Sequence, residues 1–406
     1  MVDTDFAWRL TQELVRIDSS DPGAYEDEIE RYIKALVEER LAQLSHPVLH
    51  AVQVEELEVL PGRRNLMVTV PGLSDEPRLV YICHMDTVTL GDGWDANTPP
   101  LGAVVRNDKL YGRGACDMKG GLACAIAALV HTLERVVADG ALPRRGFSLI
   151  CSVDEEDFMR GSEAAIDAGW VGSREWVLDT EPTDGQIQVA HKGRTWFEIE
   201  MAGATAHASQ PWKGADAVAA MAEAVCALRH AFAALPVHDE LGPSTITFGQ
   251  IEGGYRPYVV PDHAKVWVDM RLTPPTDTAA VTRMVEQAIA VAEAAVPGCH
   301  GSYTVTGDRP AIERDPNSPL LAALKRAADD VTDADTTVGF FTGYTDTAVI
   351  AGKTGNRNCM SYGPGSLALA HKPNEYVPHA DIVRCQQVLI ALADNVLWDA
   401  SGQVGA

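Results

Sequence analysis

The chain has 406 residues, of which 46% are hydrophobic, so it is long enough for about two domains with separate cores. Its 33 basic residues against 57 acidic ones give a formal net charge of -24. A surface this acidic repels nucleic acids and anionic membranes, so we expect neither as a partner. The charge is typical of a soluble protein, and an acidic docking surface is the alternative.

The eight cysteines are scattered and form no Cys-x-x-Cys pair, which is typical of reduced thiols in the cytoplasm. The first residues lack a basic region followed by an apolar core, so we expect no signal peptide. We also find no run of about 18 apolar residues and expect no membrane-spanning helix. The sequence therefore predicts a cytoplasmic protein.

Helices and strands alternate through the first half of the chain and again near its end. Helical spacing of apolar residues, or an Ala/Leu-rich composition, predicts helices over residues 4–16, 26–44, 119–137, 319–328 and 380–397. Short apolar runs predict strands over residues 65–70, 77–83, 147–153, 176–178 and 336–341. This alternation predicts an α/β fold with a mainly parallel central sheet flanked by helices.

The middle of the chain has a different pattern. Strands are predicted over residues 194–202, 244–252, 264–272 and 300–306, and Ala-rich helices over residues 215–235 and 278–296. The order β-α-β-β-α-β is that of a ferredoxin-like α+β domain. We predict that this domain, residues 193–307, is inserted into a larger one formed by residues 1–192 and 308–406.

Candidate metal ligands follow the predicted strands of the larger domain. His84 and Asp86 end one strand, where residues two apart share a face. His84 offers one imidazole nitrogen to a metal, while Asp86 would hold the other ring N–H or support its neighbours. Asp117 lies in a glycine-rich loop, where the backbone can approach closely and both carboxylate oxygens can bridge two metals. Capping of the following helix is the alternative for Asp117.

Three further acidic residues end the next two strands. Glu155 and Glu156 are adjacent and point in different directions, so one can bind a metal while the other serves as general base. A solvated acidic turn is the alternative for this pair. Glu181 follows the strand over residues 176–178, and Asp179 is its rival as a ligand.

His371 follows a Gly/Pro-rich loop, where a lone histidine is usually not a ligand. All five fragments nevertheless lie where an open α/β sheet places its site, at the carboxyl ends of strands. Together they supply one bridging carboxylate, two ligands for each of two metals, and a spare base. Imidazole and carboxylate ligands favour two Zn²⁺ ions, with Co²⁺ or Mn²⁺ as alternatives. Two such ions are suited to hydrolysis.

This ordered set of motifs extends along nearly the whole chain. It resembles that of the dinuclear zinc amidohydrolases and peptidases that include acetylornithine deacetylase, succinyl-diaminopimelate desuccinylase, aminoacylase and carboxypeptidase G. The resemblance implies that His84 and Glu181 bind one metal and that Glu156 and His371 bind the other. It also implies that Asp117 bridges the two ions.

The resemblance assigns further roles. Asp86 would support His84, and Glu155 would be the general base and proton shuttle. The peptide bond between Asp117 and Met118 would be cis. The inserted domain would be the family's lid, through which two subunits form a homodimer.

Two segments of the inserted domain carry the rest of the resemblance. In residues 203–209, His207 would reach the neighbouring subunit's active site and stabilise the oxyanion, with a solvated loop histidine as the alternative. In residues 269–271, Arg271 would hold the carboxylate of the substrate, with a surface charge as the alternative.

The sequence departs from the family's pattern at two positions. Tyr258 stands where relatives commonly carry an asparagine that contacts the reacting carbonyl or the substrate carboxylate, which affects how substrate is placed. Tyr344 replaces one glycine of the family's Gly-Gly-Thr-Asp turn. Thr345, in the same turn, would contact substrate or cap a helix.

We therefore predict a metal-dependent hydrolase that cleaves the amide bond of an N-acyl amino acid, a small molecule with a free carboxylate. A metal-activated water would attack, with Glu155 as general base. The segments Glu181-Pro182-Thr183 and His191-Lys192-Gly193 favour the deacetylase and desuccinylase branch. A carboxypeptidase or dipeptidase that acts on small peptides is the alternative, and a non-catalytic metal-dependent binding protein is the third candidate.

Overall fold

The computed structural model describes residues 3–398, which divide into two compact units. The described part of unit 1 comprises residues 3–189, 314–341 and 345–398. Unit 2 comprises residues 190–313 and 342–344. Each unit has a hydrophobic core of its own.

Unit 1 is built on an eight-stranded mixed sheet with the order β19-β10-β20-β9-β4-β8-β3-β2. The four strands β20, β9, β4 and β8 run parallel, whereas β8–β3, β3–β2 and β10–β20 are antiparallel pairs. In sheet order the strands span Val338–Phe341, Ile187–His191, Cys359–Ser361, Trp176–Asp179, Leu79–His84, Phe147–Ser152, Arg63–Val70 and Gln53–Leu60.

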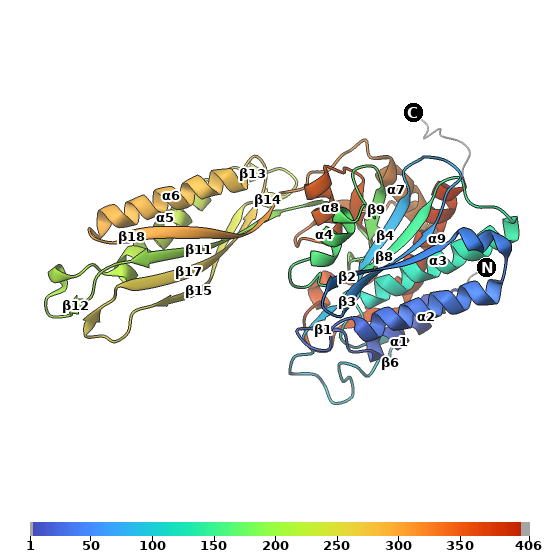
Figure 1. Ribbon diagram of the computed structural model, residues 1–406, viewed down its shortest axis with the longest axis horizontal. Helices are drawn as coiled ribbons and strands as arrows, with labels where there is room; N and C mark the ends of the chain where they lie inside the picture. Colours follow the sequence, from blue (N-terminus) through green and yellow to red (C-terminus); the bar gives the residue numbers. More distant parts are fainter. Residues whose placement is uncertain (1–2, 399–406) are drawn as a thin grey trace. The chain divides into compact units, whose positions relative to one another are not determined.

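Helices cover both faces of this sheet. Figure 1 shows α3 and α9 on one face and α4 and α8 on the other. The helices of unit 1 are α1 (Phe6–Arg16), α2 (Asp27–Leu44), α3 (Lys119–Asp139), α4 (Arg160–Asp167), α7 (Pro319–Thr332), α8 (Asp346–Thr354) and α9 (His379–Leu397). Short pieces complete the unit: β1 (Ser20–Asp21), η1 (Pro47–Ala51), β5 (Thr87–Val88), β6 (Val104–Arg106), β7 (Lys109–Tyr111), η3 (Leu367–Leu369) and β21 (Tyr376–Pro378).

Helix α3 is the one helix of the described residues whose length and composition would allow it to cross a membrane. Its apolar window is 72% buried inside the protein, which is typical of the core helix of a globular domain. The helix follows the loop that carries Asp117, and it packs against α9, α1 and β4. It therefore joins the core of unit 1 to the candidate site.

Unit 2 is a four-stranded antiparallel sheet with the order β15-β17-β11-β18 and two helices. Buried and less buried residues alternate along β11 and β17, and the buried face packs with α5 and α6 into one core. The elements are β11 (Gly193–Ala202), α5 (Ala217–Ala233), β15 (Thr245–Gly253), β17 (His263–Leu272), α6 (Thr278–Ala295) and β18 (His300–Arg309). Shorter pieces are β12 (Ala206–His207), η2 (Pro211–Lys213), β13 (Val237–His238), β14 (Gly242–Pro243) and β16 (Val259–Val260).

The predicted fold class is confirmed: unit 1 is α/β with parallel central strands, and unit 2 has the ferredoxin-like order of elements. The sequence prediction missed several elements of unit 1, among them β2, α4, β10, α8 and β20. Strand β2 lies at the edge of the sheet and carries three glutamates, so it lacks the apolar run of a central strand. Strand β20 has only three residues, which is too short for a periodic signal.

Candidate metal centre and active site

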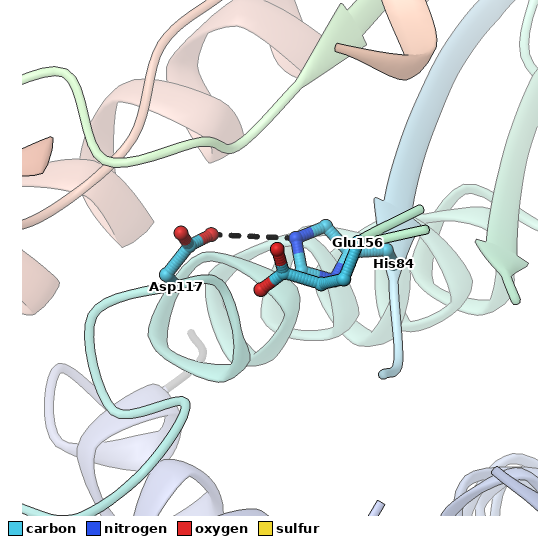
Figure 2. A group of neighbouring side chains, drawn as sticks. All are labelled: His84, Asp117 and Glu156. Carbon is cyan, nitrogen blue, oxygen red and sulfur yellow. Dashed lines mark hydrogen bonds and ion pairs between the residues drawn. The ribbon is translucent and has the colours of Figure 1, made fainter. Parts of the chain in front are cut away.

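The site lies at the carboxyl ends of the parallel strands β4, β8 and β9. His84 is the last residue of β4 and is 1% exposed. Its Nδ1 lies 2.9 Å from the main-chain oxygen of Asp86, which can only accept, so Nδ1 carries a proton. Its Nε2 faces the carboxylates of Asp117 at 3.3 Å and Glu181 at 3.7 Å. Figure 2 shows the first of these contacts. Nε2 is therefore the nitrogen available to a metal.

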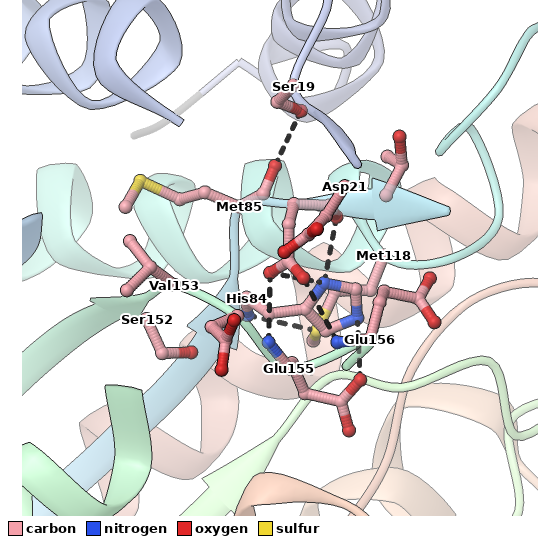
Figure 3. Close-up of polar contacts among 12 residues, drawn as sticks. Ser19, Asp21, His84, Met85, Met118, Ser152, Val153, Glu155 and Glu156 are labelled. Carbon is pink, nitrogen blue, oxygen red and sulfur yellow. Dashed lines mark hydrogen bonds and ion pairs between the residues drawn. The ribbon is translucent and has the colours of Figure 1, made fainter. Parts of the chain in front are cut away.

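Asp86 supports the neighbouring turn more closely than it supports the ring. Its two carboxylate oxygens accept the main-chain N–H groups of Glu155 at 3.2 Å and Glu156 at 3.0 Å. Figure 3 labels the two donor residues. Its carboxylate is 3.6 Å from Nδ1 of His84. Of the two roles predicted for the Asp86 carboxylate, the structure favours support of neighbours, because the main-chain oxygen of Asp86 holds the ring N–H.

Asp117 turns one oxygen toward each histidine. Its Oδ1 is 3.3 Å from Nε2 of His84, and its Oδ2 is 3.4 Å from Nε2 of His371. The peptide bond between Asp117 and Met118 is cis, as the resemblance implied. The capping alternative is not supported, because Met118 is the N-cap residue of α3. Two carboxylate oxygens that face different histidines could each bind a different metal ion.

Glu155 and Glu156 point to different partners, as expected for adjacent residues after β8. Glu155 Oε2 is 3.9 Å from Nε2 of His84, whereas Glu156 Oε2 is 2.9 Å from Nε2 of His371. Burial raises the pKa of Glu155 well above its usual value; His84 opposes this shift and Glu156 adds to it. The alternative of a solvated acidic turn fails for Glu155, which is 7% exposed.

Two acidic residues at the carboxyl end of β9 have different surroundings. Asp179 accepts a hydrogen bond from the hydroxyl of Thr347 at 2.7 Å and points into a buried polar cluster. Glu181, two residues later, has its carboxylate 3.7 Å from Nε2 of His84. The structure thus favours Glu181 over Asp179 as a candidate ligand.

The donor set fits divalent metal ions. Side-chain atoms of His84, Asp117 and Glu156 lie within 4.8 Å of one another, and so do those of His84, Glu155 and Glu181. Glu156 Oε1 is buried and has no hydrogen-bond partner among the described residues, which leaves it free to bind a cation. Clustered carboxylates in a buried site need positive charge to compensate them. The two cysteines that precede candidate ligands have other partners: Cys83 Sγ contacts the hydroxyl of Thr180, and Cys116 Sγ contacts the main-chain oxygen of Ser366.

Glu375 and Arg113 support the loop that carries Asp117, and neither residue was predicted from the sequence to have a role. Glu375 Oε1 accepts the main-chain N–H groups of Cys116 at 2.9 Å and Asp117 at 3.1 Å. Its Oε2 accepts from Arg113 at 2.7 Å, and both side chains are buried. A signal was present, since Glu375 follows His371 by four residues and Arg113 lies between two glycines of the Asp117 loop.

Three predicted site residues lie in unit 2. His207 is exposed in β12, and its Nδ1 accepts the main-chain N–H of Ser209 at 3.1 Å. The neutral ring of His207 therefore carries its proton on Nε2 and can donate from there. Tyr258 is 62% exposed. Arg271, on β17, donates to Asp269 at 2.8 and 3.1 Å, so its guanidinium already has one carboxylate partner.

Thr345 begins the helix α8. It is buried, and its hydroxyl accepts the main-chain N–H of Ala348 at 3.4 Å and contacts the hydroxyl of Thr347 at 2.8 Å. Capping of α8 accounts for the position of the Thr345 side chain. Contact between Thr345 and substrate stays a prediction.

The comparison with protein families decides what kind of site this is. The model of Peptidase family M20/M25/M40 matches residues 80–395, a range that includes every residue of the cluster. The chain belongs to the M20 family. The M20 family and its deacylase relatives make this protein a hydrolase of amide or peptide C–N bonds.

Relatives with assigned names support the same membership. The chain is 26% identical over 353 residues to a protein named probable succinyl-diaminopimelate desuccinylase from Staphylococcus aureus, with 80% of this chain and 84% of the relative covered. It is 27% identical over 331 residues to acetylornithine deacetylase from Myxococcus xanthus, with 80% and 82% covered.

Solved M20 structures share the fold. A metallo-carboxypeptidase from Sulfolobus solfataricus matches with a TM-score of 0.75 at 18% identity and covers 95% of this chain and 98% of its own. A dinuclear metal-binding peptidase from Bacillus subtilis matches with a TM-score of 0.69 at 16% identity and covers 97% and 99%. At these identities the likeness concerns the fold alone.

Proposed function

We propose that this M20 hydrolase uses two metal ions to remove the acyl group from an N-acyl amino acid. The observation that carries the proposal is the position of Asp117, whose two oxygens each face one histidine. The names of its relatives, a desuccinylase and a deacetylase, support an acyl group as the part removed. Imidazole and carboxylate donors favour Zn²⁺, with Co²⁺ or Mn²⁺ as substitutes.

We assign the ligands as follows. His84 and Glu181 hold one ion, Glu156 and His371 hold the other, and Asp117 lies between them. The proximity of His84 to Glu181, at 3.7 Å, and of His371 to Glu156, at 2.9 Å, supports this division. When bound, such ions lower the pKa of a water molecule and polarise a substrate carbonyl.

Glu155 is the proposed general base. It is buried at the same strand end as Glu156, and among the described residues its carboxylate forms no ion pair with Arg113. It would take a proton from the attacking water and return it to the leaving amine, so that one group serves both halves of the reaction.

Unit 2 would supply the lid. His207 Nε2 would donate to the oxyanion, Arg271 would hold the substrate carboxylate, and Tyr258 would replace the family's asparagine. We further propose a homodimer through unit 2, in the cytoplasm. Exposed apolar side chains of unit 2 support a protein contact; among them are Trp212, Val218, Ile251, Tyr255 and Tyr258.

A carboxypeptidase or dipeptidase is the second candidate, since the structural match from Sulfolobus solfataricus is a metallo-carboxypeptidase. Both candidates share the proposed metal centre and differ in the bond that is cleaved. A non-catalytic binding protein is disfavoured, because the candidate ligands and the candidate base lie together at one site.

The test is a panel of N-acetyl, N-succinyl and N-carbamoyl amino acids and dipeptides, assayed with Zn²⁺ or Co²⁺ after chelation. We expect hydrolysis of one acyl class, complete loss on chelation, and recovery with added metal. Glu155→Gln should lower kcat by about 100- to 10,000-fold while two metals stay bound. Preference for dipeptides would favour the second candidate, and unchanged turnover of Glu155→Gln would refute the base.

A further inference from the structure

The turn that carries Glu155 and Glu156 is held by its main chain. Three successive N–H groups donate to buried carboxylates: that of Asp154 donates to Glu26 Oε1 at 3.0 Å. Those of Glu155 and Glu156 donate to Asp86 (Figure 3). Asp154 has a φ of 66°, in the left-handed region that residues other than glycine rarely adopt. Such a backbone persists only where the surroundings hold it.

Arg63, the first residue of β3, supplies positive charge to this network together with Arg160, which donates to the Asp154 carboxylate. Its Nε and Nη2 donate to the two oxygens of Glu26, each at 2.6 Å. Nη2 also donates to Asp21 at 2.6 Å, and Nη1 lies 3.3 Å from Asp154 Oδ1. Arg63 is 7% exposed, while Glu26 and Asp154 are fully buried. Bidentate, charge-assisted bonds of this kind are strong, and exclusion of water strengthens them.

The same face of β3 also carries Asn65, which binds both ends of the loop over residues 153–161. Asn65 is two residues beyond Arg63, so the two side chains share a face of the strand. Its Oδ1 accepts the N–H of Val153 at 3.0 Å, and its Nδ2 donates to the main-chain oxygen of Gly161 at 2.8 Å. Strand β3 therefore holds the segment 153–161 at both ends.

We propose that Arg63 is a positioning residue for the metal centre. It holds Glu26, whose carboxylate accepts the N–H of Asp154 and so fixes the turn in which Glu155 and Glu156 keep their orientations. This inference rests on the roles proposed above for Glu155 and Glu156. The structure gives Arg63 no direct bond to either of them among the described residues, so its influence passes through the main chain.

A third metal site is the competing explanation for this acidic cluster. Oxygens of Asp21, Glu26 and Asp86 lie within 4.8 Å of one another. Arg63 already donates to Asp21 and Glu26, and two main-chain N–H groups donate to Asp86. The protein therefore already supplies the positive charge and the bonding partners that these carboxylates would otherwise gain from a metal ion.

The chain offers a matched control in Arg64, the next residue of β3. Arg64 forms ion pairs with Asp27 at 3.0 Å, Glu30 at 3.6 Å and Glu56 at 3.3 Å. It has the same chemistry on the same strand, and it points to the opposite face. Its loss would remove ion pairs without releasing the turn.

The experiment compares Arg63→Lys with Arg64→Lys in the full chain. Lysine keeps the charge and loses the bidentate geometry. Co²⁺ is titrated into metal-free protein and followed by its visible absorption, and kcat and KM are measured on the best substrate of the panel. For Arg63→Lys we expect Co²⁺ affinity and kcat to fall by about 10- to 100-fold, with KM nearly unchanged. Arg64→Lys should match wild type in all three.

Equal effects of the two substitutions on Co²⁺ affinity and kcat would overturn the proposal. If Arg63→Lys does not fold, Glu26→Gln replaces it, because glutamine keeps the volume and an oxygen for the Asp154 N–H. If the wild type hydrolyses nothing on the panel, the proposed function fails, while the Co²⁺ titration still decides the role of Arg63. Two Co²⁺ ions bound with wild-type affinity in Glu26→Gln and Arg63→Lys would refute it.

Discussion

At the scale of single residues, Glu375 controls Asp117 through the main chain. Its carboxylate accepts the N–H groups of Cys116 and Asp117 and pairs with Arg113. Arg113 also donates to main-chain oxygens on the far side, at Thr89 and Leu90. Because a buried ion pair is costly to break, this pair holds the loop in one geometry.

Replacement of Glu375 by glutamine should therefore weaken the metal centre. We expect Glu375→Gln to lower Zn²⁺ affinity by about 10- to 100-fold, since the Asp117 loop loses its charged support. We also expect the free energy of unfolding of the metal-free protein to fall by about 3 kcal/mol, because Arg113 is left buried without its partner. Competition with a chromophoric chelator and urea denaturation measure the two quantities.

Asp381→Asn is the matched control for this prediction. Asp381 also accepts a main-chain N–H, from Gly365 at 3.3 Å, and pairs with an arginine, Arg384, at 2.9 Å. Its hydrogen bonds and ion pairs among the described residues go to Gly365 and Arg384, not to the Asp117 loop. A loss of Zn²⁺ affinity as large in Asp381→Asn as in Glu375→Gln would show that the effect is general.

The candidate ligands could be predicted from the sequence more readily than the residues that support them. His84, Asp117, Glu156, Glu181 and His371 each follow an apolar run or a glycine loop, and such positions can be read from a single chain. Residues that act by accepting main-chain N–H groups have no comparable local pattern. Their partners are set by the fold, as the separation of 37 residues between Arg63 and Glu26 illustrates.

At the scale of elements, helices α3 and α9 are joined by a polar contact as well as by their apolar faces. His131 lies 3.0 Å from Asp394, and Arg135 donates to the same carboxylate at 2.6 Å. Burial raises the pKa of Asp394, but the bonds from His131 and Arg135 outweigh burial and hold it below its usual 3.8. The carboxylate is therefore stabilised in the folded state.

A lowered pKa in the folded state has a defined effect on stability. The contribution of Asp394 is fully present above its unfolded pKa and is lost as the pH falls through its folded pKa. We expect Asp394→Asn to lower the free energy of unfolding by about 1 kcal/mol at pH 7, because the pair is partly exposed. The difference from wild type should shrink below about pH 4. Urea denaturation at pH 7, 5 and 3.5 measures it.

Asp139→Asn serves as the control, because Asp139 lies 3.7 Å from the same Arg135 and is more exposed than Asp394. We expect little change at any pH. The assigned contact would be wrong if Asp139→Asn lost as much free energy of unfolding as Asp394→Asn. It would also be wrong if the difference in stability between Asp394→Asn and wild type grew on acidification.

Long, strongly periodic elements could be predicted from the sequence, and short ones at the edges could not. The expected helix over residues 380–397 is observed as α9 at His379–Leu397, because its apolar stripe faces the core. Helix α8 was missed, since its nine residues follow the Thr345 turn without a long periodic pattern. Tertiary contact, rather than local propensity, stabilises such short helices.

At the scale of the whole molecule, we propose that a catalytic unit and a lid share one chain and that the lid serves the neighbouring subunit. We expect His207→Ala to lower kcat by about 100- to 1,000-fold, because one donor to the oxyanion is lost. Metal content should not change, since His207 lies in unit 2 and the candidate ligands lie in unit 1. Turnover and metal analysis of the purified variant measure both.

A mixing experiment tests whether His207 acts across subunits. Neither His207→Ala nor Glu155→Gln should be active alone, but a dimer with one chain of each keeps one complete site. Unfolding and refolding the two together should therefore restore part of the activity. His300→Ala, which changes another exposed histidine of unit 2, should behave as wild type. If a verified mixed dimer showed no restored activity, His207 would not act in the neighbouring subunit's site. It would then act in the site of its own subunit or have no catalytic role.

The two-part organisation could be predicted because the pattern of elements changes near residue 193 and returns after residue 307. The substrate could not be predicted in the same way. The residues proposed to select it, Tyr258 and Arg271, belong to a different unit than the candidate metal ligands. No local motif encodes how such surfaces meet a ligand.

The candidate ligands are spread from His84 to His371, and unit 2 lies between the fourth and the fifth of them in the chain. During synthesis the ribosome therefore releases four ligands long before the last one emerges. The nascent chain must complete the whole of unit 2 before His371 is available. The full set of candidate ligands is therefore complete only once the chain has been made as far as His371, and products truncated before it would lack the fifth ligand.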